Sequence, residues 1–242
     1  MIYSLMEKQY SFEELESFAK AMKGMSDFIR SQKPNYIFAP VIGSVPLIDA
    51  LVITDRHFPF ENVEYPPNSS RFTDREELIR KWYSNFLTSA YSGEKMSIMC
   101  VDEVISGSSA SKGYQEFQKI LNEKGLAKQI DFTIAGIGEK PRRGRKRNHN
   151  FLRLVNNKKA KVFEAQKILT ADNVLLNPIR LKIGQPNPQG RNTYLPEIES
   201  INYSPEYREL LEDLAKYCGT DPSQVSASNI LKVGNSLEKY LR

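Results

Sequence analysis

The stretch from Ile98 to Lys112 constrains the fold of this chain more than any other part of the sequence. It begins with four apolar residues, which predict a buried β-strand. The acidic pair Asp102 and Glu103 follows where that strand would emerge, and the small residues from Ser106 to Ser109 come shortly after. A helical pattern of apolar residues comes next. This order predicts a strand, a loop that carries acids and hydroxyls, and a helix, which is the repeating unit of α/β proteins.

The chemistry of this stretch suits a sugar phosphate. Backbone N–H groups at a helix N-terminus attract anions, and small side chains let an anion approach closely. Two adjacent carboxylates accept hydrogen bonds from vicinal hydroxyls and bind Mg²⁺ through oxygen. We therefore expect a ribose 5-phosphate, with its diol and Mg²⁺ at the acids and its phosphate at the loop. The acids are Asp102 and Glu103, and the loop residues are Ser106, Gly107, Ser108 and Ser109.

The same residues resemble the phosphoribosyl pyrophosphate (PRPP) signature of the type I phosphoribosyltransferases. That signature has several apolar residues, two acids, two apolar residues and then Thr-Gly-x-Thr or a close variant. This chain has Asp102-Glu103, Val104-Ile105 and Ser106-Gly107-Ser108-Ser109, in which Ser replaces Thr and keeps the hydroxyl. The resemblance implies that Asp102 and Glu103 are the catalytic and metal-binding residues. The alternative interpretation is an ordinary strand-turn-helix with a solvated acidic pair.

An earlier part of the chain repeats the strand-loop-helix order. Tyr36 to Ile42 predicts a buried strand, and Leu47 to Ile53 predicts a helix after a Gly-Ser turn. In the resembling family this turn binds pyrophosphate, which implies a substrate-binding role for Ile42, Gly43, Ser44 and Val45. Many family members carry Arg or Lys there, whereas this chain has neither between Pro40 and Pro46. A plain strand-to-helix turn is the other interpretation.

The segment from Asn68 to Thr73 is polar and rich in turn-forming residues, which predicts a surface loop. Thr73 with Glu76 has the spacing of a capping box and predicts the start of a helix. The resembling enzymes carry a flexible lid at this point. Arg71 and Arg75 are therefore candidates for lid cations that meet the pyrophosphate, and solvated loop arginines are the alternative.

The positive charge of the chain is concentrated in one place. The formal net charge is +5, and the run from Lys140 to Arg147 holds six basic residues and no acid. We rank a solvated loop first and a nucleic-acid contact second, with a clamp on a polyphosphate substrate as the third interpretation. No aromatic residues interrupt the run, so nucleic acid would be held through phosphates by Arg142, Arg143, Arg145, Lys146 and Arg147.

The resemblance implies an α/β fold with a mostly parallel twisted sheet flanked by helices and a hood that chooses the base. We expect this domain to span residues 1–183, a loop or linker to span 184–202, and a helical C-terminal extension to span 203–242. The apolar runs are too short to cross a bilayer, and no signal pattern opens the chain, so we expect a cytoplasmic protein without membrane contact. Two cysteines give no disulfide framework.

The resemblance implies an enzyme that transfers the phosphoribosyl group of Mg-PRPP to a nitrogenous base and releases pyrophosphate. An alternative from another class is a regulator that binds PRPP or a nucleotide but is weak or inactive in transfer. The missing cation between Pro40 and Pro46 and the unmatched basic run favour that alternative. A nucleic-acid-associated protein is a third interpretation, and self-association into a homo-oligomer stays open.

Overall fold

The computed structural model describes residues 9–68, 71–139, 146–171, 177–186, 190, 192–224 and 227–242. Its helices are α1 (Phe12–Gln32), α2 (Ser44–Thr54), α3 (Arg75–Ala90), α4 (Ser108–Glu123), α5 (His149–Asn156), α6 (Pro205–Cys218) and α7 (Ala227–Leu241), with short 3₁₀ turns η1 (Phe60–Asn62) and η3 (Pro222–Gln224). Its strands are β1 (Tyr36–Phe38), β2 (Val63–Glu64), β3 (Met96–Val104), β4 (Ile130–Glu139), β5 (Ala160–Ala165), β6 (Ile179–Ile183) and β7 (Tyr194–Ile201).

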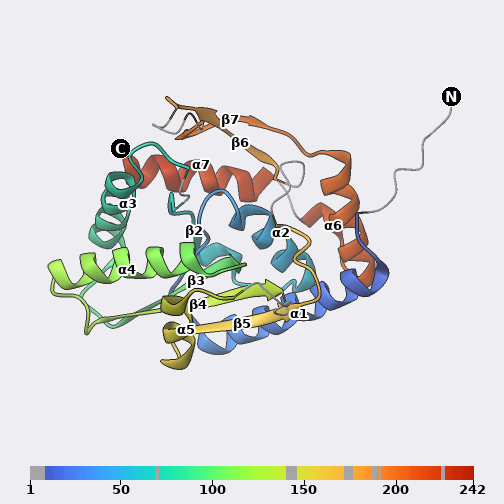
Figure 1. Ribbon diagram of the computed structural model, residues 1–242, viewed down its shortest axis with the longest axis horizontal. Helices are drawn as coiled ribbons and strands as arrows, with labels where there is room; N and C mark the ends of the chain where they lie inside the picture. Colours follow the sequence, from blue (N-terminus) through green and yellow to red (C-terminus); the bar gives the residue numbers. More distant parts are fainter. Residues whose placement is uncertain are drawn as a thin grey trace.

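The first five strands form one parallel sheet in the order β2-β1-β3-β4-β5. Figure 1 shows β3, β4 and β5 of this sheet side by side. β3 and β4 are its long central pair, and they are joined through α4. Helices connect successive strands, because parallel neighbours need a crossover that returns the chain to the same end of the sheet. The predicted α/β class, with a parallel sheet flanked by helices, is confirmed.

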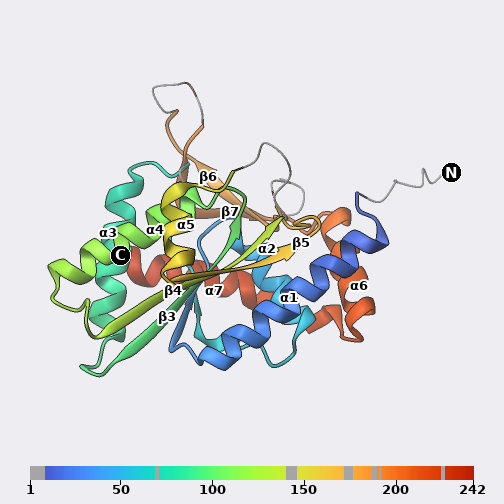
Figure 2. The same cartoon turned by 60° about the horizontal axis from the view of Figure 1, so that its bottom comes forward.

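The strands bury alternate side chains on the two faces of the sheet, as the two-residue period of a strand requires. Ile37, Met99 and Val101 lie on one face and pack with α1, α2 and α6. Phe38 and Cys100 lie on the other face and pack with α3 and α4. Both faces are covered, which explains why these strands read as continuous apolar runs in the sequence. Figure 2 shows α1 running alongside β4 and β5.

The two C-terminal helices pack closely against earlier parts of the chain. α6 lies against α1 and α2, and α7 lies against α3 and α2 (Figure 1). The ring of Tyr240 on α7 contacts Trp82 and Phe86 on α3, with ring centroids 4.9 Å and 5.5 Å apart. α7 therefore closes the core on the α3 side. No helix among the described residues combines the length and apolar content needed to cross a bilayer.

The segment expected to be a loop or linker, residues 184–202, contains a strand. β7 pairs antiparallel with β6, so the two form a separate hairpin. Pro196 and the Pro, Asn and Gly residues before it hid the strand in the sequence. A proline is tolerated in β7 because the pairing with β6 is irregular along this stretch, with register shifts between Arg180 and Leu181 and between Leu181 and Ile183. The expectation of an irregular linker over this whole segment was wrong.

The predicted capping box at Thr73 is also wrong. α3 begins one residue later than a Thr73 cap would require, with Asp74 in a left-handed conformation at the N-cap and no side-chain cap bond. The Thr73 hydroxyl lies 2.6 Å from the hydroxyl of Thr193 instead. The segment before α3 is thus attached to the β6–β7 hairpin, a tertiary partner that the local sequence does not reveal.

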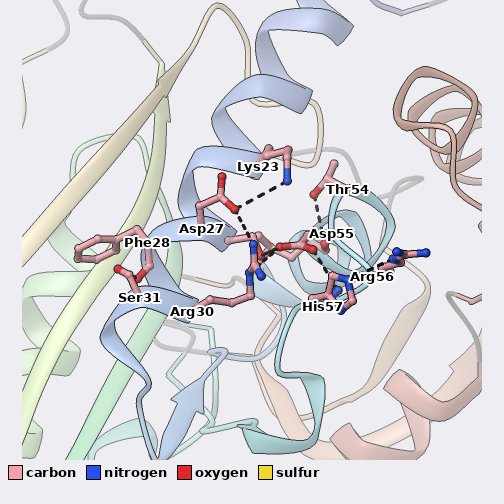
Figure 3. A network of polar contacts seen from close by, with 11 residues as sticks. Lys23, Asp27, Phe28, Arg30, Ser31, Thr54, Asp55, Arg56 and His57 are labelled. Atoms are coloured by element: carbon pink, nitrogen blue, oxygen red, sulfur yellow. Dashed lines mark hydrogen bonds and ion pairs between the residues drawn. The ribbon is translucent and has the colours of Figure 1, made fainter.

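A polar network joins α1 to the end of α2 (Figure 3). The Arg30 guanidinium bonds Asp27 at 2.8 Å and Asp55 at 3.0 Å, and the Ser26 hydroxyl donates to Asp55 at 2.9 Å. Burial would raise the pKa of Asp55, but the His57 N–H, the Ser26 hydroxyl and the Arg30 charge lower it below its usual value. A helix that follows a parallel strand runs back along the sheet, so this network lies toward the amino ends of the strands and fixes the scaffold.

Candidate functional site

The strand order reverses at β1, which is the place where a doubly wound sheet opens a crevice. β2 lies on one side of β1 and β3 on the other, so the connections after β1 and β3 lead away in opposite directions. Ligands of open α/β sheets bind outside the carboxyl ends of the strands at such a switch point. The two loops that the sequence singled out, residues 42–45 after β1 and residues 102–109 at the end of β3, are the loops at this point.

One side chain joins these two loops. The Ser44 hydroxyl is buried and lies 3.1 Å from the carbonyl oxygen of Val101 and 3.4 Å from Oδ1 of Asp102. Ser44 is the first residue of α2, whereas Asp102 lies near the end of β3. The structure therefore brings together the predicted pyrophosphate loop and the predicted ribose-binding acid.

Asp102 lies in surroundings that disfavour its charge. Burial raises its pKa to about 7, against the opposing effects of the Glu103 N–H, which donates at 2.9 Å, and of the Ser44 hydroxyl. Burial and, to a smaller extent, the Asp102 carboxyl raise the pKa of the Cys100 thiol well above its usual value. A carboxyl with a strongly shifted pKa at a sheet crevice is typical of functional sites.

Glu103 is held by a residue that the sequence analysis did not identify. The Thr170 hydroxyl donates to Oε1 of Glu103 at 2.6 Å. Thr170 is buried and follows β5, so it reaches the site from the far side of β4. Its one sequence signal was its place shortly after a predicted strand, where polar residues gather at the carboxyl edge of a sheet.

The loop after Glu103 turns sharply into α4. Gly107 has φ +76°, a left-handed conformation that glycine adopts readily, and a Cβ there would lie 2.3 Å from Cγ of Phe151. The Ser108 N–H points to the Ser106 hydroxyl at 3.3 Å. The N–H groups of the first turn of a helix have no carbonyl partners within that helix, so the Ser109 amide is of the kind that binds anions, whereas the Ser108 amide donates to Ser106 in this structure.

A second polar contact crosses the site from the segment before β6. Nδ2 of Asn177 donates to the carbonyl oxygen of Ile42 at 3.1 Å. The peptide bond between Val41 and Ile42 is cis, and Gly43 is exposed. Thr170 and Asn177 thus contact the two loops of the site from one stretch of chain, whose residues 172–176 lie outside the described part.

The two candidate lid arginines have different surroundings. The backbone at Arg71 is tied to β7, because the Tyr194 N–H donates to the Arg71 carbonyl at 2.8 Å. The Arg75 guanidinium donates to the side-chain oxygen of Asn68 at 2.7 Å, and burial lowers its pKa. Asn68 in turn packs against Gly113 on α4. Arg75 therefore fastens the loop to the start of α3, and it is not a solvated loop arginine.

Much of the basic run lies outside the described residues, including Arg142, Arg143 and Arg145. Lys146 is exposed, whereas the Arg147 guanidinium forms an ion pair with Glu164 on β5 at 2.9 Å. Arg147 therefore has a structural partner at the carboxyl end of the sheet, next to Gly138.

Asp102 and Glu103 are suited in type to Mg²⁺, which commonly takes one or two carboxylates from the protein and completes its shell with water and substrate phosphates. Within the part of the chain that the structure describes, no group of three or more His, Cys, Asp or Glu side chains is placed to hold a metal ion. Metal held here would thus need oxygen ligands from the substrate as well. No protein-family model, curated protein or solved structure significantly matches this chain.

Proposed function

We propose that this protein binds Mg-PRPP at the β1/β3 crevice and transfers its phosphoribosyl group to a nitrogenous base, releasing pyrophosphate. The observation that carries the proposal is the contact between the Ser44 hydroxyl and Asp102, which puts a Gly-Ser turn beside an acid pair at the switch point. The resemblance to the PRPP signature supplies the substrate class, and the pKa of about 7 for Asp102 agrees with a functional carboxyl.

Each part of the site has a role in this proposal. The carboxylates of Asp102 and Glu103 accept hydrogen bonds from the two ribose hydroxyls and supply protein ligands to Mg²⁺, whose charge offsets that of the pyrophosphate. The loop from Ser106 to Ser109 and the N-terminus of α4 hold the 5-phosphate. The backbone of residues 42–45 meets the pyrophosphate, with Arg71 as the lid cation. The later part of the domain, up to residue 183, is the proposed hood.

The reaction itself needs positioning and charge stabilisation. The bond between ribose C1 and the pyrophosphate oxygen breaks with its electron pair leaving on pyrophosphate, and a nitrogen lone pair of the base forms the new bond to C1. The base then loses a proton. Positive charge develops on the ribose in the transition state, where the nearby carboxylates stabilise it. Holding the base in line with C1 supplies the rest of the rate enhancement.

The alternative function is a regulator that binds PRPP or a nucleotide and does not transfer. Two observations favour it: the turn from Pro40 to Pro46 carries no cation, and Arg75 is already committed to Asn68. Both functions use the same crevice, so binding and turnover must be measured separately. Nucleic-acid binding by the basic run would be a further property, tested by replacing Arg142, Arg143, Arg145, Lys146 and Arg147 with Gln.

Calorimetry with PRPP, with and without Mg²⁺, tests the site. We expect Mg²⁺-dependent binding that Asp102→Asn/Glu103→Gln weakens by at least about a hundredfold, because hydrogen bonds to charged groups each contribute about 1.5–3 kcal/mol. A matched control is Asp131→Asn/Glu123→Gln, which removes two exposed carboxylates from surface ion pairs with Lys159 and Arg80. The control should bind as wild type does.

A screen of nucleobases for pyrophosphate release then separates the two functions. Release with at least one base supports transfer, and binding without any release supports the regulator. Absence of PRPP binding to the wild type would contradict transfer, and absence of nucleotide binding as well would contradict the regulator. Equal weakening in the site variant and the control would contradict the assignment of the site to Asp102 and Glu103.

A further inference from the structure

Asn229 on α7 reaches the candidate pyrophosphate loop from the other end of the chain. Its side chain is buried, with 2% of its surface exposed. Nδ2 donates to the carbonyl oxygen of Val45 at 3.3 Å and also to Oδ1 of Asp49, while Oδ1 of Asn229 accepts from the Tyr65 hydroxyl. The amide therefore uses both of its N–H bonds and its oxygen, and no other side chain of this size offers that set.

The contact falls on the loop that matters for the proposed function. Val45 follows Ser44, the residue that contacts Asp102, and both side chains are fully buried in the first turn of α2. The N–H groups of Ser44 and Val45 donate to Pro40 and Ile42 carbonyls, so these residues form one hydrogen-bonded turn. A partner on the Val45 carbonyl limits how that turn can move.

Asn229 belongs to a buried cluster that joins α2, α6 and α7. Asp49 on α2 accepts from the Tyr207 hydroxyl on α6 as well as from Asn229. The ring of Tyr203 stacks on Tyr207 with centroids 5.9 Å apart. Burial raises the pKa of Asp49 to about 7, and the two hydrogen bonds act in the opposite direction. The cluster thus holds both C-terminal helices against the helix that begins at the crevice.

We propose that Asn229 is a positioning residue for the turn from Ile42 to Val45, and that α7 thereby sets how the crevice binds pyrophosphate. The ligand part of this inference rests on the proposed function. The structural part, that the Asn229 amide restrains the turn, does not. Asn229 acts through the Val45 carbonyl, so removing that one bond loosens the turn even when the rest of the cluster is intact.

A double variant in which two side chains are swapped distinguishes an effect on the position of the turn from an effect on the stability of the fold. Asp49→Asn/Asn229→Asp keeps one carboxyl and one amide in the cluster. Asn at 49 can accept from Tyr207 and donate to the carboxylate at 229, which can also accept from Tyr65. The Val45 carbonyl, however, loses its side-chain donor, because a carboxylate has none. The matched control is Tyr65→Phe, which removes a hydrogen bond on the opposite side of the Asn229 amide and leaves the bond to Val45.

Hydrogen exchange at Ser44 and Val45 is the direct readout, and urea unfolding reports the fold. We expect the double variant Asp49→Asn/Asn229→Asp to have a higher urea unfolding midpoint than Asn229→Asp alone. Its amides at 44 and 45 should nevertheless exchange about tenfold faster than in wild type, since one hydrogen bond contributes on that scale. In Tyr65→Phe, the hydrogen-exchange rates of the Ser44 and Val45 amides should change no more than those of its other helical amides. Pyrophosphate should bind about tenfold more weakly to the double variant than to wild type, whereas Tyr65→Phe should bind it as wild type does.

Two results would overturn the inference. The first is hydrogen exchange at the Ser44 and Val45 amides as slow as in wild type in a folded Asp49→Asn/Asn229→Asp protein. The second is equally faster hydrogen exchange at these two amides in Tyr65→Phe. If the double variant does not fold, Asn229→Ser is measured in its place against the same control. This substitution removes the bond from the Asn229 amide to the Val45 carbonyl without adding a charge. Failure of the wild type to bind PRPP would remove the proposed function, whereas the amide exchange would still decide the role of Asn229.

Discussion

At the scale of the residue, Asp102 is the most informative side chain of the crevice. Its carboxyl is buried enough that its pKa rises to about 7, although the Glu103 N–H and the Ser44 hydroxyl both favour the charged form. The fold therefore keeps a carboxyl where ionisation is costly. A carboxyl buried in this way lowers the stability of the folded protein wherever it is ionised.

Asp102→Asn should stabilise the ligand-free protein more at pH 8 than at pH 5. With the folded pKa raised above the unfolded value, the folded state binds more protons between about pH 4 and 7, so wild-type stability falls as pH rises through that window. The neutral amide of Asp102→Asn does not titrate, so the stability of the variant does not fall in this way as pH rises. The gain of the variant should grow by on the order of 2 kcal/mol from pH 5 to pH 8. Urea unfolding at both pH values measures it, and an equal gain at both would contradict the raised pKa.

Thr170→Val should weaken Mg²⁺-dependent PRPP binding about fivefold to tenfold, because the hydroxyl that donates to Glu103 is lost while the shape is kept. Thr170→Ser retains the hydroxyl and should bind within about twofold of wild type. Calorimetry on both variants checks this. If the serine variant is as weak as the valine variant, packing of the methyl group rather than the hydrogen bond positions Glu103.

At the scale of the element, the turn into α4 depends on a glycine for two separate reasons. Gly107 has a left-handed φ, and the ring of Phe151 from α5 occupies the space that a Cβ would take. The backbone N–H of Asn148, at the start of α5, also donates to the Ser106 carbonyl at 2.7 Å. α5 therefore shapes the proposed phosphate loop from behind.

Gly107→Ala should destabilise the protein by about 3 kcal/mol, which combines roughly 1 kcal/mol for the left-handed conformation with overpacking against Phe151. Gly125→Ala is the matched control, since Gly125 has φ +70° and open space around the Cβ position. It should cost about 1 kcal/mol. Chemical unfolding of both variants gives the comparison, and equal costs would show that the Phe151 contact can relax.

At the scale of the whole molecule, the last helix is part of the core. Tyr240, two residues from the end of the chain, is 2% exposed, stacks its edge on Trp82 and donates to Glu64 at 3.1 Å. The Trp82 indole N–H in turn donates to the Ser236 carbonyl at 3.3 Å. The C-terminal helices therefore stabilise the sheet's two covering layers, in addition to reaching the crevice through Asn229.

Tyr240→Ala should cost about 3–5 kcal/mol of unfolding free energy, the usual cost of removing a buried aromatic ring. The control on the same helix is Leu231→Ala, whose side chain is 64% exposed and should change stability by less than about 0.5 kcal/mol. Thermal and urea unfolding measure both. A loss for Tyr240→Ala no greater than that of the control would mean that α7 is not part of the cooperative core.

The sequence by itself determined the local features of this protein. The apolar run before Asp102, the small residues that follow and the helix period after them specify strand, turn and helix through contacts within a few residues. They place the acids at the end of β3 and Gly107 at the turn. The parallel sheet follows from the alternation of such units.

Only the tertiary structure decided which distant residues meet at the crevice. Thr170, Asn177 and Asn229 contact Glu103, Ile42 and Val45 across separations of 67, 135 and 184 positions. A polar side chain looks the same in a sequence whether it faces water or a buried partner. Its role is fixed by strand order and by the docking of the C-terminal helices, because a buried carbonyl or carboxylate needs a partner that the packing alone brings within reach.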